Sequence, residues 1–256
     1  MVIKSELQTS LLPIQTVPYA VVFPTTCVRT LLWLHGYQER SEDLLTHPLF
    51  EQLAEIHQAA IVFPDVPDSY YLNQSWNHCY TEDFLIEEFI PYITKQHQLP
   101  AARNSMFLAG ISMGGFGSLL IGTHNPGLFG KIACISGAFI LDDLLIGNPE
   151  VVGSSSNINH FRNLFGDIPS LADDSTRNPL CAIEAMEDKQ SLPAVFLSCG
   201  TEDLLYKRNV RLHHRMQELN HDVSWYEASG NHNWDFFNQA IINLFEWLQG
   251  TELCVN

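Results

Sequence analysis

The sequence predicts an α/β fold with a mostly parallel central sheet and helices on both faces. Several runs of residues are apolar without alternation, which is typical of strands buried on both faces. Helical patterns separate most of these runs, as in crossover connections between parallel strands. The 256 residues are 46% apolar, enough for one sizeable core, so we expect residues 1–256 to form a single domain. The expected strands are 18–25, 29–36, 59–65, 106–111, 131–136, 194–199 and 223–228.

Helices are expected between and after these strands, because apolar residues there recur at helical spacing. We expect Thr81 to be the N-cap of one helix and Pro91 to kink it. The segment 139–190 instead mixes Gly, Pro, Ser and Asp with scattered aromatic residues, which indicates a lid-like insertion over the sheet. The expected helices are 44–56, 81–98, 115–124, 206–220 and 234–249.

The charge of the chain argues against two classes of partner. Nucleic acids and anionic membranes both require clustered Lys and Arg, and the sequence has only 13 such residues and a net charge of −16. No apolar run has the length of a signal peptide or a membrane span. We therefore expect a cytoplasmic protein without nucleic-acid or membrane partners. The sequence leaves homo-oligomer formation open.

The six cysteines lack the CxxC spacing of zinc sites, and several lie in apolar runs, where a thiol is buried as a small hydrophobic group. We expect neither a disulfide nor a metal.

The most informative stretch surrounds Ser112. The apolar run 106–111 leads into Gly110-Ile-Ser-Met-Gly114, and a helix follows until Pro126 stops it. This order of strand, sharp turn and helix is that of the nucleophile elbow of an α/β-hydrolase, in which glycines beside the serine permit a tight turn. The pentapeptide alone also fits an ordinary glycine-rich turn, so the interpretation depends on the rest of the chain.

A serine nucleophile needs a histidine base and a carboxylate that orients it, and in this fold they follow the serine in the order acid, histidine. His232 lies between the expected strand 223–228 and the last helix, where the base belongs. Asp203 follows the expected strand 194–199 and is our choice for the acid. The alternatives for the acid are Glu202, Asp142 and Asp143.

The oxyanion of the tetrahedral intermediate needs two preorganised N–H donors. One is expected from Met113, the residue after the nucleophile. The other is expected from Tyr37, because His35-Gly36 follows the strand that begins at residue 29 and lets the backbone turn toward the site. His35 itself is expected to shape this loop.

A set of short motifs spans residues 30–249 in a fixed order. They are Leu32-Trp-Leu-His-Gly36, Gly110-Ile-Ser-Met-Gly-Gly115, Asn163-Leu-Phe-Gly-Asp167, Cys199-Gly-Thr-Glu-Asp-Leu-Leu-Tyr206 and His232-Asn-Trp-Asp-Phe-Phe237. In these motifs the chain resembles the esterase D-like esterases, in particular the tributyrin esterase branch. The resemblance implies an α/β-hydrolase that cleaves short-chain acyl esters without a metal or organic cofactor. It also implies a triad of Ser112, Asp203 and His232, with Met113 and Tyr37 as oxyanion donors.

Two loops depart from the pattern of that branch. The loop 37–43 lacks its glycines and asparagines, and the segment 67–80 is also short of glycine. Both loops are expected to border the substrate. Trp76, Tyr80 and Phe165 are the candidate substrate-binding residues, although packing within the core or the insertion is a competing interpretation for each.

We interpret the chain as a serine carboxylesterase acting on a small acyl ester. The enzymatic alternatives are an S-formylglutathione-type thioesterase, a polysaccharide acetyl or feruloyl esterase, and an acyltransferase. The non-enzymatic alternative is a catalytically silent α/β-hydrolase that serves as a binding module.

Overall fold

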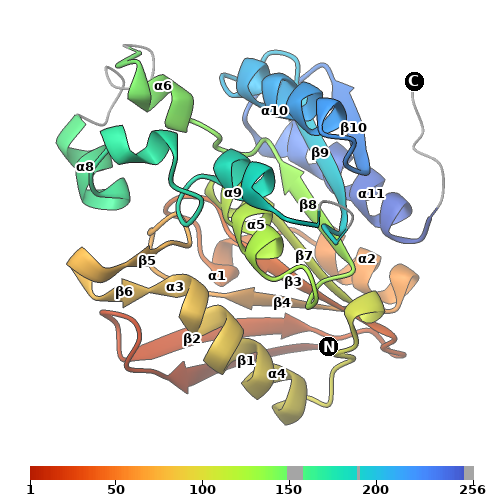
Figure 1. Cartoon of the computed structure of the whole chain (residues 1–256). Helices are drawn as coiled ribbons and strands as arrows, with labels where there is room; N and C mark the ends of the chain where they lie inside the picture. The colour runs from red at the N-terminus through yellow and green to blue at the C-terminus, as the bar shows by residue number, and fades with distance from the viewer. Residues whose placement is uncertain (149–157, 189–190, 251–256) are drawn as a thin grey trace.

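An eight-stranded sheet runs through the molecule in the order β1-β2-β4-β3-β7-β8-β9-β10 (Figure 1). The structure is a computed structural model that describes residues 1–148, 158–188 and 191–250. From β4 to β10 neighbouring strands are parallel, whereas β2 is antiparallel to both β1 and β4. The predicted mostly parallel sheet is therefore confirmed. The strands are β1 (Val2–Gln8), β2 (Thr16–Val22), β3 (Arg29–Leu34), β4 (Ala59–Pro64), β7 (Met106–Ile111), β8 (Lys131–Ile135), β9 (Ala194–Gly200) and β10 (Val223–Ala228).

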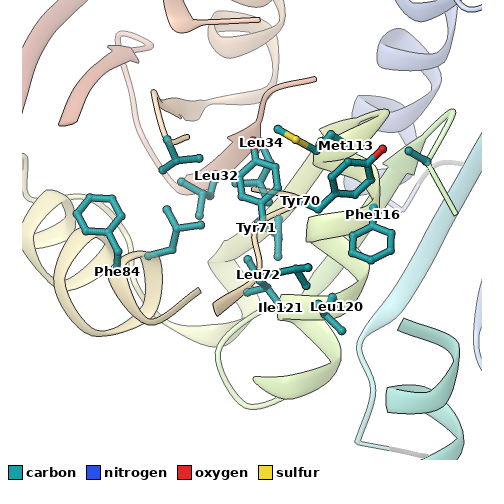
Figure 2. Packing of buried hydrophobic residues seen from close by; sticks show 14 of the residues in the cluster. Leu32, Leu34, Tyr70, Tyr71, Leu72, Phe84, Met113, Phe116, Leu120 and Ile121 are labelled. Atoms are coloured by element: carbon teal, nitrogen blue, oxygen red, sulfur yellow. The ribbon is translucent and has the colours of Figure 1, made fainter. Parts of the chain in front are cut away.

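Helices cover both faces of this sheet, as predicted. On one face lie α2 (Leu49–His57) and α11 (Trp234–Leu248), and on the other lie α4 (Ile90–Gln96), α5 (Met113–His124), α9 (Pro179–Ala185) and α10 (Tyr206–Glu218). Strand β3 shows why its sequence is apolar without alternation. Leu31 and Trp33 face the layer of α2 and α11, while Leu32 and Leu34 face the layer of α5. Figure 2 shows the second layer, with Phe116 and Leu120 of α5 near Tyr70, Tyr71 and Leu72.

Two predicted helices differ from the observed ones. The helix expected over 44–56 is split into α1 (Ser41–Leu44) and α2, with Pro48 directly before α2. Its last apolar residue, Ile56, is 67% exposed, so it does not belong to the buried stripe.

The helix expected over 81–98 is irregular before Pro91, and the kink expected at Pro91 stays a prediction. It consists of α3 (Thr81–Asp83), a π-helical turn (Phe84–Phe89) and α4. Because Pro91 has no N–H, the chain loses one helical hydrogen bond here, and the wider turn lies where that bond is missing. Thr81 is the first helical residue, not the N-cap, because its hydroxyl hydrogen-bonds Ser69 Oγ at 2.7 Å.

The segment 139–190 contributes α6 (Leu141–Leu145), α8 (Ile158–Phe165) and α9 to the described part of the chain. Phe161, Leu164 and Phe165 of α8 are buried and join the core on the α5 side. A small hairpin, β5 (Asn73–Gln74) and β6 (Cys79–Tyr80), lies beside this helix. Among the described helices, none has the length and apolarity needed to cross a membrane.

Candidate active site

Ser112 lies in a strained turn between β7 and α5. Its φ of 54° and ψ of −114° are unfavourable for a residue with a side chain, which costs about 1–3 kcal/mol and persists only where neighbours hold it. The neighbours are in β8 and its following loop: Ser112 N–H donates to the Ile135 carbonyl, and Ala138 N–H donates to the Ser112 carbonyl, both at 2.9 Å. The strand, turn and helix predicted around Ser112 are therefore present.

The two glycines that flank Ser112 are required by close backbone contacts. A Cβ on Gly114 would overlap the carbonyl group of Leu34, and one on Gly110 would overlap the carbonyl group of Gly114. No side-chain rotation relieves these contacts, because the opposing atoms belong to the main chain. The G-x-S-x-G spacing thus lets α5 begin directly against the end of β3.

His232 and Asp203 meet beyond the carboxyl ends of β10 and β9. The His232 Nδ1 atom lies 2.8 Å from Asp203 Oδ2, and the Asp203 side chain is fully buried. Burial alone would raise the pKa of Asp203, but the hydrogen bond and charge of His232 and the N–H of Leu205 outweigh it, so this pKa lies below its usual value. Asp203 therefore stays ionised and accepts the Nδ1 proton, which leaves Nε2 of His232 as the basic nitrogen.

The other acids proposed from the sequence are engaged elsewhere. Glu202 is exposed and accepts the N–H of Gly230, which shapes the loop before His232. Asp143 forms a buried ion pair with Arg208, and Asp142 pairs with Arg211 at 3.3 Å. Of the acids considered for this role, Asp203 is the one with a hydrogen bond to His232.

The turn after β3 lies against the nucleophile. A Cβ placed on Gly36 would come within 3.8 Å of Ser112 Cβ. The Gly36 N–H is already used, since it donates to Glu39 Oε2 at 3.0 Å, and Tyr37 supplies the next N–H in this turn. Met113 is the first residue of α5, and N–H groups in the first turn of a helix have no intrahelical acceptor. Tyr37 therefore follows a glycine that lies beside Ser112, and Met113 directly follows Ser112; the role of both as oxyanion donors stays a prediction.

Buried side chains fix the position of this turn. The His35 ring contacts the carbonyl oxygens of Gly36 at 2.7 Å and Val66 at 3.1 Å. Tyr71 donates its hydroxyl to the His35 carbonyl at 2.9 Å. Tyr70 and Tyr71 both have positive φ values, 55° and 62°, which is unusual for aromatic residues. Sequence reasoning did not single out either tyrosine, because no local motif marks a strained non-glycine pair.

The insertion reaches the same turn through α8, because the His160 ring packs edge-on against Tyr37, with ring centroids 5.9 Å apart. The carbonyls at the end of α8 are capped by the β5–β6 hairpin: Gln74 donates to Leu164 O at 2.8 Å, and Trp76 Nε1 donates to Asn163 O at 2.9 Å. The hairpin thus anchors α8, the helix whose His160 contacts Tyr37 in the turn after β3.

The three candidate substrate-binding residues have different surroundings. Trp76 is 42% exposed, but its indole N–H is engaged by α8. Phe165 is fully buried between Tyr70 and Phe116, with ring centroids 4.7 and 6.0 Å away, so its position is that of a packing residue. Tyr80 is half-buried in β6, paired with Asn73. Contact of these three residues with substrate stays a prediction.

Cysteine and metal chemistry were not expected from the sequence. Cys27, Cys79, Cys134, Cys181 and Cys199 carry free thiols, and Cys254 lies outside the described residues. Within the described ranges, no group of three or more His, Cys, Asp or Glu side chains could hold a metal ion. The absence of a cofactor stays a prediction.

The sheet order, the serine turn and the His232–Asp203 pair at one sheet edge define the α/β-hydrolase class. Residues 18–248 match the family described as "Putative esterase", and the chain belongs to this family. It is an enzyme of the esterase type, acting on ester bonds. The family predicted from the sequence motifs is therefore confirmed, while the tributyrin branch stays a prediction.

Known proteins similar to this chain share nearly its whole length. An acetyl esterase from Caldicellulosiruptor saccharolyticus is 29% identical over 221 residues, 86% of this chain and 83% of the relative. An S-formylglutathione hydrolase structure from Staphylococcus aureus covers 97% of this chain and 98% of its own, with a TM-score of 0.83 and 23% identity. A fluorophosphonate-binding serine hydrolase F structure, also from Staphylococcus aureus, has the same coverage, a TM-score of 0.84 and 21% identity. The two structures show that the fold is shared.

Proposed function

We propose that this chain is a serine carboxylesterase that hydrolyses short-chain acyl esters through an acyl-enzyme. The observation that carries the proposal is the 2.8 Å hydrogen bond between His232 Nδ1 and the buried Asp203, on the sheet edge where Ser112 occupies its strained turn. A histidine oriented by a carboxylate is the base that a serine nucleophile requires. The name of the acetyl esterase relative supports a short acyl group.

The proposed reaction has two halves that use the same residues. His232 Nε2 takes the hydroxyl proton as Ser112 Oγ attacks the ester carbonyl, and Asp203 stabilises the imidazolium. The N–H groups of Met113 and Tyr37 stabilise the oxyanion, each donor contributing roughly 10²- to 10³-fold in rate. The alcohol leaves with the proton from His232, and water then cleaves the acyl-enzyme by the same route.

The proposal is tested by labelling and turnover. A fluorophosphonate probe should add to Ser112 in the wild type and not in Ser112→Ala, as read by mass spectrometry. Nitrophenyl esters of increasing acyl length should show the highest kcat/KM at two to four carbons. Absence of an adduct on Ser112 in folded protein would overturn the proposal.

Thioester hydrolysis is the main rival, since it would use the same triad. Turnover of S-formylglutathione well above that of short nitrophenyl esters would favour it. The cytoplasmic location and any homo-oligomer stay predictions from the sequence.

A further inference from the structure

Glu39 closes the turn after β3, which contains Gly36 and Tyr37, through two hydrogen bonds. Its Oε2 atom accepts the Gly36 N–H at 3.0 Å, and its own N–H donates to the Gly36 carbonyl at 3.2 Å. The residue is half-buried, unlike Glu42 a few residues later, whose side chain is 75% exposed. The carboxylate is therefore held in one place by the turn that it closes.

The Glu39 carboxylate and the Ser112 side chain border the same small space. A Cβ built on Gly36 would lie 3.5 Å from Glu39 Oε2 and 3.8 Å from Ser112 Cβ. Gly36 has no side chain, so this point, which the Ile111 carbonyl oxygen also borders at 3.8 Å, holds no Cβ. A substrate whose carbonyl is attacked by Ser112 comes close to this charge.

No cation neutralises the Glu39 carboxylate in the described part of the chain. The adjacent Arg40 pairs with Asp68 at 3.1 Å and donates to the backbone carbonyl of Glu39, not to its carboxylate. Burial raises the pKa of Glu39 above its usual value and the charge of Asp43 adds to this, whereas the Gly36 N–H and His232 act in the opposite direction. The ionised Glu39 carboxylate is therefore a negative charge beside the Gly36 turn that has no ion-pair partner among the described residues when His232 is neutral.

We propose that Glu39 is a specificity-determining residue that makes the site select uncharged esters over anionic ones. This inference rests on the proposed esterase function. Like charges within about 10 Å of each other in a protein site repel enough to change kcat/KM on the order of ten-fold after partial screening. Glu39 was not singled out in the sequence, because a glutamate in a loop is ordinarily a solvated charge.

The test compares two esters that differ in charge, methyl 4-nitrophenyl adipate and 4-nitrophenyl hydrogen adipate. Rates are divided by the rate of hydroxide hydrolysis of each ester, so that intrinsic reactivity cancels. The wild type should prefer the neutral ester by about ten-fold or more. Glu39→Gln keeps an oxygen that accepts the Gly36 N–H and removes the charge. It should reduce this preference about ten-fold, mainly through a lower KM for the anionic ester.

Glu42→Gln is the matched control, because it removes an exposed charge three residues further along the chain, in α1, and should leave the preference unchanged. Circular dichroism establishes that the variants are folded. A wild type without the preference would overturn the inference, as would a Glu39→Gln variant that retains it while hydrolysing the neutral ester. These results differ from those expected if the proposed esterase function is wrong. In that case the wild type would hydrolyse neither ester, and Ser112 would not be labelled.

Discussion

The Nδ1 atom of His124 lies 2.9 Å from Oε1 of Glu82, at the opposite end of α5 from Ser112. Its other ring nitrogen lies 2.8 Å from the carbonyl oxygen of Ser175 in the insertion. Both ring nitrogens therefore face acceptors, and one acceptor is a carboxylate, so the doubly protonated imidazolium satisfies both contacts. This residue joins three separate segments: α5, α3 and the insertion.

The His124 contacts predict that stability falls with rising pH. Burial alone would lower the pKa of His124, but Glu82 and the Ser175 carbonyl raise it above its usual value. A group whose pKa is higher in the folded than in the unfolded state stabilises the fold through its protonated form. This contribution is complete at pH values below the unfolded pKa, about 6.5, and is lost as the pH rises through the folded pKa. Near pH 6 the wild type should be more stable than His124→Gln by about 1 kcal/mol in the free energy of unfolding. Its melting temperature should therefore exceed that of the variant most near pH 6 and by less near pH 9. The exposed His214→Gln serves as control, and a pH-independent difference for His124→Gln would contradict the assignment.

Replacement of Asp203 should abolish most activity while keeping the fold. In Asp203→Asn the amide oxygen keeps the N–H of Leu205, and the NH2 group faces Nδ1 of His232 as a donor. His232 then adopts the wrong tautomer, and kcat should fall by about 10⁴-fold. Steady-state kinetics with a short nitrophenyl ester measure the effect. Glu202→Gln, which removes the exposed neighbouring charge, should stay within about three-fold of the wild type. Near-normal kcat in Asp203→Asn would show that another acid orients His232.

A methyl group at Gly114 should destabilise the whole fold. The added Cβ overlaps the main chain at Leu34, so either β3 or α5 must shift, and we expect a loss of about 3 kcal/mol or more in the free energy of unfolding. Gly127→Ala is the matched control, because a Cβ there has no atom within 4 Å. Urea unfolding of both variants measures the difference. Equal stability of the two variants would mean that the turn is looser than described.

The capping of α8 predicts unequal effects of two substitutions in the hairpin. Gln74 is buried and donates to the carbonyls of Ser69 and Leu164. Gln74→Leu removes both bonds, although the Ser69 carbonyl keeps the N–H of Leu72, and it should cost about 2–3 kcal/mol. Trp76→Phe removes a hydrogen bond at an exposed position, and should cost less than about 1 kcal/mol. Thermal melts give the ranking. The reverse order would show that Trp76, not Gln74, holds the helix.

The sequence predicts those parts of the molecule whose signals are local. Strands β3, β4, β7, β8 and β9 appear as apolar runs because both of their faces are buried, as Leu31 and Leu32 of β3 illustrate. The elbow glycines and the loop positions of Asp203 and His232 follow from short motifs. The edge strand β1 gave no such signal, because its residues are mostly exposed and therefore need not be apolar.

Other features depend on contacts between distant segments. The positive φ values of Tyr70 and Tyr71 and the bond from Gln74 to α8 have no local sequence mark. Glu39 is the clearest case, since its importance comes from the absence of a side chain at Gly36 and the proximity of Ser112. Each of these features is set by what packs against the segment, which one sequence does not reveal.

The two main-chain hydrogen bonds that hold Ser112, to Ile135 and from Ala138, involve no side-chain atom. Substitutions in the surrounding loops can therefore change the shape and charge of the pocket without removing the bonds that position the nucleophile. Only a change that deletes a backbone donor, such as proline at position 138, removes one of them directly. This separation allows related chains to diverge in substrate choice while the attacking hydroxyl keeps its place, and it makes the scaffold suitable for redesigning specificity through its loops.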